Sequence, residues 1–252
     1  MIDRADLMTK AIQLRKRLGE DSSSPIDIFS VARSIGNLTL VFYPMGENLS
    51  GMCVKGESGN CIIAINSAMS LGRQRYSLAH EFYHMYYDDT MVSLCAKKIG
   101  SGKDVERKAD LFASFFLMPA DELEKRSSDL ASKNGDNKLT IYDIIRIEQY
   151  FGVSHQAAVI RLKDSPYLSQ RLVDEYLNSS VRYKAEMMGY DSELYFPLPE
   201  EKQYKTYGLY IDQANRLFQN ELISDGKYEE LLLDAFRTDL VYGGEEGGDV
   251  ID

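Results

Sequence analysis

Residues 75–87 read RYSLAHEFYHMYY and place His80 and His84 four positions apart. On a helix, residues four apart lie on the same face, so both imidazoles can reach one metal ion at about 2.0–2.1 Å. Glu81 projects beside this pair and can accept a proton from an attacking water instead of binding the metal. The stretch therefore predicts a helix over about residues 73–87 that carries two histidine ligands and a glutamate general base.

A hydrolytic metal site of this kind needs a third protein ligand and one open position. Glu106 is the best candidate, because it lies 22 residues beyond His84 at the start of the next predicted helix, about residues 104–117. Asp110 lies one helical turn further on and can accept a hydrogen bond from the second ring nitrogen of a ligand histidine. Three other acidic residues are alternative ligands: Asp88, Asp89 and Asp104.

Metal-assisted hydrolysis at a carbonyl group also needs a hydrogen-bond donor for the oxyanion that develops on the substrate. Three side chains are candidates for this role: Tyr76, Tyr83 and His155. The two tyrosines belong to the helix of the metal site, whereas His155 begins a helix much further along the chain. A surface position in a first helical turn is the simpler explanation for His155.

The segment before the metal-site helix predicts strands, so we expect an α+β fold. Short β-like runs at residues 39–43, 51–54 and 62–65 are separated by turn signals rich in Gly, Pro and Asn. They predict a small, mostly antiparallel sheet packed on helices. We expect an extended substrate to add a strand at the sheet edge near residues 62–66.

A resemblance to a known family rests on three blocks that occur in order: RYSLAHEFYH at 75–84, ERKADLFA at 106–113 and LMP at 117–119. Over about residues 5–165 the chain resembles the ImmA/IrrE metallopeptidases. The resemblance implies a gluzincin-like zinc-peptidase core with His80, His84 and Glu106 as ligands and Glu81 as general base. It also implies cleavage of a helix-turn-helix repressor, which releases prophage, mobile-element or stress genes. Tyr83 departs from the family, which usually has glycine before the second histidine.

The patterns divide the chain into four expected regions. These are a zincin-like metallopeptidase core at 1–125, a helix-turn-helix-like helical segment at 126–165, an acidic, Tyr-rich helical region at 166–242 and a disordered tail at 243–252. The helix-turn-helix-like segment combines helical patterns at 139–150 and 154–162 around a Gly152-Val153 turn. Residues 166–252 hold 8 Lys/Arg and 18 Asp/Glu, which accounts for the whole net charge of −10.

Composition narrows the function classes. The 252 residues are 44% hydrophobic and 27% charged, which is typical of a globular protein, and no apolar run approaches the ~18–20 residues of a membrane span. The charged N-terminus lacks the apolar core of a signal peptide, so we expect a cytoplasmic protein. No basic stripe is present, so direct nucleic-acid binding is not expected. Cys53, Cys61 and Cys95 fit no zinc-finger spacing and are expected as reduced thiols, although the first two could face each other across a hairpin.

Three hypotheses follow. The first is a zinc-dependent endopeptidase that cleaves a protein, although a His/His/Glu site also takes manganese, cobalt or iron. The second is a non-cleaving protein with the zincin shell, which would act as an anti-repressor or a toxin–antitoxin component by binding. The third, a DNA-binding regulator, is disfavoured by the acidic charge.

Overall fold

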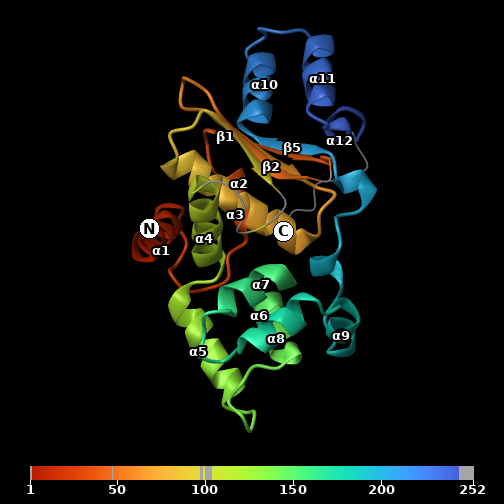
Figure 1. Cartoon of the computed structure of the whole chain (residues 1–252). Helices are drawn as coiled ribbons and strands as arrows, with labels where there is room; N and C mark the ends of the chain where they lie inside the picture. Colours follow the sequence, from red (N-terminus) through yellow and green to blue (C-terminus); the bar gives the residue numbers. More distant parts are fainter. Residues whose placement is uncertain (1, 47, 97–98, 100–103, 244–252) are drawn as a thin grey trace.

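A computed structural model describes residues 2–46, 48–96, 99 and 104–243 (Figure 1). The helices and strands, in chain order, are α1 (Arg4–Arg17), α2 (Ile28–Arg33), β1 (Leu38–Tyr43), β2 (Leu49–Lys55), β3 (Cys61–Asn66), α3 (Leu71–Tyr87), β4 (Val92–Ala96), α4 (Asp104–Leu117), α5 (Ala120–Ala131), α6 (Ile141–Phe151), α7 (His155–Leu162), α8 (Gln170–Leu177), α9 (Arg182–Met187), β5 (Lys205–Gly208), α10 (Leu209–Gln219), α11 (Asp225–Asp234) and α12 (Thr238–Tyr242). This arrangement confirms the predicted α+β class.

Within the described ranges the strands form a five-stranded sheet in the order β4-β2-β3-β1-β5. β1 and β3 are parallel, whereas the other three pairings are antiparallel, so the sheet is mostly antiparallel as predicted. The expectation that a substrate strand adds at residues 62–66 is wrong. β3 lies in the middle of the sheet, and its main-chain groups already pair with β1 on one side and β2 on the other.

The helix of the metal site, α3, lies across one face of the sheet and contacts β2, β3 and α4 (Figure 1). Its apolar side belongs to the main core, where the Phe82 and Phe116 rings pack edge to face with centroids 5.8 Å apart. Arg15 of α1 is fully buried and donates a hydrogen bond of 2.6 Å to the Phe116 carbonyl oxygen at the end of α4. These contacts fix α4 beside α3.

The helix-turn-helix-like pair is formed by α6 and α7. Thr140 and Asp143 form a reciprocal capping box that begins α6, and Gly152 ends it in the left-handed region at φ 64°. A Cβ at Gly152 would lie 2.8 Å from Arg75 Nε, so the turn packs closely on α3. The pair is therefore joined to the helix of the metal site.

The predicted C-terminal region is mostly helical, but it also contains β5, which the sequence patterns missed. β5 pairs antiparallel with β1, so this region and the predicted core share one sheet. The division into four regions stays a prediction, and most of the expected disordered tail, residues 244–252, lies outside the described residues. None of the described helices is both long and apolar enough to span a membrane.

Candidate metal centre

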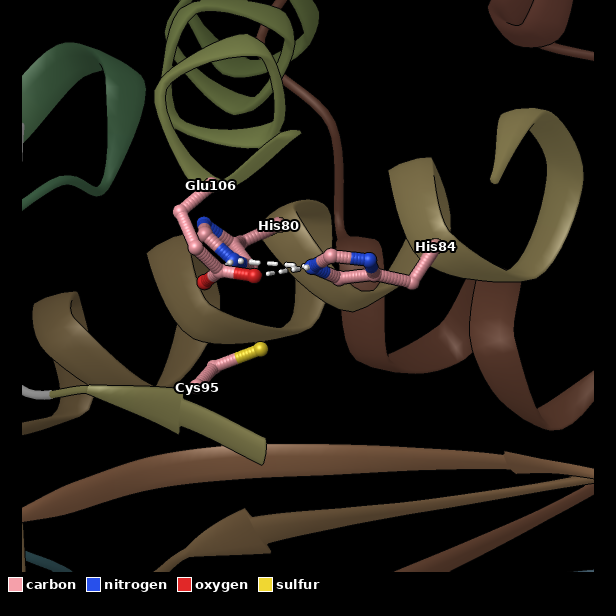
Figure 2. A group of neighbouring side chains, drawn as sticks. All are labelled: His80, His84, Cys95 and Glu106. Carbon is pink, nitrogen blue, oxygen red and sulfur yellow. Dashed lines mark hydrogen bonds and ion pairs between the residues drawn. The ribbon is translucent and has the colours of Figure 1, made fainter. Parts of the chain in front are cut away.

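Three predicted ligands converge between α3 and α4 (Figure 2). The Nε2 atoms of His80 and His84 lie 3.2 Å apart on one face of α3. Glu106, in the first turn of α4, faces both rings: its Oε2 lies 3.3 Å from His80 Nε2 and its Oε1 lies 3.5 Å from His84 Nε2. The structure thus brings together side chains from two helices that are separated by strand β4 in the chain.

These separations fit a tetrahedral metal ion. Two ligand atoms that each lie about 2.0–2.1 Å from a tetrahedral zinc ion are about 3.3–3.4 Å from each other. The three observed separations are 3.2, 3.3 and 3.5 Å. Two imidazole nitrogens and a carboxylate form a donor set that suits zinc and other divalent metals.

A carboxylate lies within hydrogen-bond distance of the Nδ1 atom of each of the two histidine rings. Asp110 Oδ1 lies 2.9 Å from His80 Nδ1, as the sequence predicted, and Asp88 Oδ2 lies 2.8 Å from His84 Nδ1. Such bonds place the proton on Nδ1 and leave Nε2 free for a metal. Asp88, considered above as a ligand, is instead placed as a partner of a ligand histidine.

The other two alternative ligands are not part of this group, which comprises His80, His84, Cys95 and Glu106 among the residues that the structure describes. Asp104 is 80% exposed and lies 3.8 Å from Arg107, and Asp89 is exposed. Neither carboxylate faces the two rings.

A comparison with known families matches the segment that contains this site. The IrrE N-terminal-like domain, Peptidase_M78, matches residues 39–163, which include both histidines and Glu106. This segment, just under half of the chain, is therefore a domain of the Peptidase_M78 type. The match confirms the resemblance to ImmA/IrrE metallopeptidases that the three sequence blocks carry. No curated protein matches the chain.

Cys95 is a fourth member of the group within the Peptidase_M78 domain, and the sequence patterns did not predict it. Its Sγ and the ligand atoms of His80, His84 and Glu106 all lie within 4.8 Å of one another (Figure 2). It comes from β4, 11 residues after His84, and no metal-binding spacing marks it. The sequence alternation gives no such signal either, because the apolar side chains of Val92 and Leu94 are exposed in the structure, whereas Ser93 and Cys95 are buried.

Glu81 lies fully buried beside the histidine pair, against the sheet. A Cβ on Gly51 of β2 would lie 2.8 Å from Glu81 Oε1, so the absence of a side chain at Gly51 makes room for the carboxylate. Neither carboxylate oxygen has a hydrogen-bond partner among the described residues. Burial raises the pKa of Glu81 to about 7. A carboxylate with this pKa can accept and return a proton near neutral pH.

The two histidines differ in their electrostatics. Burial opposes the charge on His80, but hydrogen bonds with Asp110, Cys95 and Glu106 hold its pKa well above the usual value. Burial lowers the pKa of His84, whereas the hydrogen bond with His80 lowers the pKa of Glu106. A metal that binds here has to displace the proton of His80, so its affinity falls at low pH.

None of the three predicted oxyanion donors is placed with a free donor facing the group. The Tyr76 hydroxyl donates to the Asp110 carbonyl oxygen at 2.7 Å. His155 is engaged elsewhere through both ring nitrogens, with Glu148 Oε2 at 2.8 Å and the Tyr176 carbonyl oxygen at 2.9 Å. The ring of His155 joins α7 to α6 and α8, so its position agrees with the simpler explanation of a residue in the first turn of a helix outside the site.

Tyr83, which replaces the usual family glycine, points into the core. Its ring packs against Phe112 and Tyr87 with centroids 5.7 and 6.0 Å away, and it is 5% exposed. The bulky side chain therefore fills the α3–α4 interface and does not narrow the region in front of the metal ligands.

Proposed function

We propose that the chain is a zinc-dependent endopeptidase that hydrolyses a peptide bond in a protein substrate. The observation that carries this proposal is the convergence of His80, His84 and Glu106 next to the buried, unpartnered carboxylate of Glu81. The match of residues 39–163 to a metallopeptidase family supports it. Zinc is the proposed metal because the ligand separations match a tetrahedral ion, and manganese suits the same donor types.

The metal, when bound, supplies a Lewis acid that polarises the scissile carbonyl and makes water a stronger nucleophile near neutral pH. Glu81 accepts a proton from the attacking water and returns it to the leaving amine. Its fully buried position excludes bulk water, which keeps the proton within the site. Asp110 and Asp88 hold the two imidazoles so that both Nε2 atoms stay directed at one point.

The substrate strand has a different place from the one expected in β3. Among the described strands, β4 pairs with β2 alone and forms the edge of the sheet next to the metal group. An extended peptide can add to this free edge through main-chain hydrogen bonds. We therefore place the substrate along β4, where the scissile bond would come close to Glu81.

A helix-turn-helix transcriptional repressor is the proposed substrate, and its cleavage would derepress prophage, mobile-element or stress genes in the cytoplasm. The sequence blocks at 75–84, 106–113 and 117–119 support this proposal through the family that they resemble. The net charge of −10 on residues 166–252 also favours a basic partner over nucleic acid.

The test is incubation of the zinc-loaded chain with purified helix-turn-helix repressors of the same genome, followed by mass spectrometry of the products. The wild type is expected to cut one internal bond. Glu81→Gln should retain zinc and lose at least 100-fold in rate, the lower range for general acid–base catalysis at roughly 10²–10⁴. Undiminished cleavage by Glu81→Gln would disprove the mechanism.

A non-cleaving anti-repressor is the second candidate function, and the Cys95 thiol favours it. Closed four-ligand metal sites are typical of structural zinc, whereas catalytic sites keep one position open. A zinc-loaded chain that forms a stable complex with a repressor and leaves it at full length would support this alternative.

A further inference from the structure

Cys95 differs from the other two cysteines in its surroundings. Cys53 and Cys61 belong to the apolar core, where their Sγ atoms lie 3.4 Å apart. Cys95 is also fully buried, but it lies outside that core cluster and faces the two imidazoles and Glu106. A buried cysteine that serves only as a small apolar residue would be surrounded by apolar groups.

An irregularity in the sheet directs Cys95 at this group. The register between β2 and β4 shifts at Ser50: Leu49 pairs with Ala96, whereas Gly51 pairs with Cys95. Ser50 Oγ donates a hydrogen bond of 3.2 Å to the Cys95 carbonyl oxygen. Such bulges bend a strand locally and change where its side chains point. Because Gly51 faces Glu81, its pairing partner Cys95 lies on the same side of the sheet.

We propose that the Cys95 thiolate is the fourth protein ligand of the metal and closes the site in its resting state. This inference rests on the proposed function, because it assigns a further ligand to the same centre. In a tetrahedral zinc site, a sulfur at about 2.3 Å and a nitrogen at about 2.0–2.1 Å from the ion are about 3.6 Å apart. The four donor atoms already lie within 4.8 Å of one another. A shift of about 1 Å therefore brings the sulfur into the fourth position.

The buried, unpartnered oxygens of Glu81 are a second observation that points to the same position. They lie beside the group, so a sulfur in the fourth position would take the place of the water that Glu81 is proposed to deprotonate. When the metal binds, the Cys95 thiol releases its proton to solvent. When a water replaces the sulfur at the metal, the thiolate takes up a proton again, so the exchange of sulfur for water is balanced. Cys95 would thus keep the peptidase latent until a substrate or partner displaces the sulfur.

X-ray absorption at the zinc edge tests this proposal on the full zinc-loaded chain without any substrate. The wild type should show one sulfur at about 2.3 Å together with nitrogen and oxygen ligands at about 2.0–2.1 Å. Cys95→Ser and Cys95→Ala should lose the sulfur and show nitrogen and oxygen ligands alone. Cys53→Ser is the matched control, since it removes a buried thiol from the same face of the sheet, and it should keep the sulfur signal.

The outcomes separate this inference from the proposed function. Stoichiometric zinc with no sulfur neighbour in the wild type overturns the role of Cys95 and leaves the three-ligand peptidase site intact. A sulfur signal that persists in both Cys95 variants also overturns it. A wild type that binds no zinc at all refutes the proposed function together with the inference. A wild-type spectrum without sulfur overturns the inference even if a variant fails to fold, and a second Cys95 variant is available to assign the sulfur if the first does not fold.

Discussion

The two carboxylates behind the histidine rings should control metal affinity although neither touches the metal. Asp110 and Asp88 accept from the Nδ1 atoms of His80 and His84 at 2.9 and 2.8 Å, and their side chains are 12% and 11% exposed. At this exposure water screens the charge of each carboxylate only weakly. Each hydrogen bond to a histidine should therefore be as strong as a charge-assisted hydrogen bond away from solvent.

The size of the effect follows from what each replacement leaves behind. Loss of such an outer partner costs about 10–100-fold in metal affinity, equivalent to about 1.4–2.7 kcal/mol. Asn keeps an acceptor oxygen and loses only the charge, so Asp110→Asn and Asp88→Asn should each weaken zinc binding roughly 10-fold. Ala removes the acceptor as well, so Asp110→Ala and Asp88→Ala should each approach roughly 100-fold.

Competition with a chromogenic zinc chelator at neutral pH measures these affinities. Asp104→Ala is the matched control, because Asp104 is an acidic residue near Glu106 that is 80% exposed and faces away from the rings. It should bind zinc like the wild type. If Asp110→Ala and Asp88→Ala are folded and also bind zinc like the wild type, then the Nδ1 bonds do not orient the rings and the reasoning is refuted.

Three further predictions concern the surroundings of the site. Gly51→Ala places a Cβ 2.8 Å from Glu81 Oε1 and should slow cleavage about 100-fold without loss of zinc. The control Gly135→Ala, at an exposed position, should change neither the cleavage rate nor the zinc content. A Gly51→Ala variant that cleaves as fast as the wild type would contradict the close packing of Gly51 on Glu81. Glu81→Gln should stabilise the metal-free chain at pH 8, by up to about 3 kcal/mol, and little at pH 5, as measured by denaturant unfolding. The sign follows from the raised pKa of Glu81, about 7 in the folded chain. Between about pH 4.5 and 7 the unfolded chain binds fewer protons than the folded chain, so wild-type stability falls as pH rises. A stability difference between Glu81→Gln and the wild type that does not change with pH would contradict this prediction. His155→Gln should lower the free energy of unfolding by about 3 kcal/mol, because it leaves the buried carboxylate of Glu148 less well paired. The zinc content should not change. Loss of zinc without loss of stability would instead indicate that His155 acts at the metal site.

The local part of the site was predictable from the sequence. His80, Glu81 and His84 depend on the geometry of a single helix, in which a spacing of four residues places two side chains on one face. Glu106 and Asp110 lie one turn apart on a second helix, so they too form a local pattern. Once the two helices pack, the ligands and the outer carboxylate meet as expected.

The remaining features depend on pairings between distant segments, which periodicity cannot specify. Cys95 reaches the metal group because β4 pairs with β2 across a bulge at Ser50, and neither the partner strand nor the bulge is encoded in the spacing of cysteines. β3 is internal because β1 lies beside it in parallel, although the two are separated along the chain by β2. His155 lies away from the site, because its ring contacts Glu148 on the preceding helix. Residues 75–87 and 106–110 therefore specify the proposed metal ligands and general base. Strand order and register decide where Cys95 and the edge strand β4 lie, because both depend on long-range packing of the whole sheet.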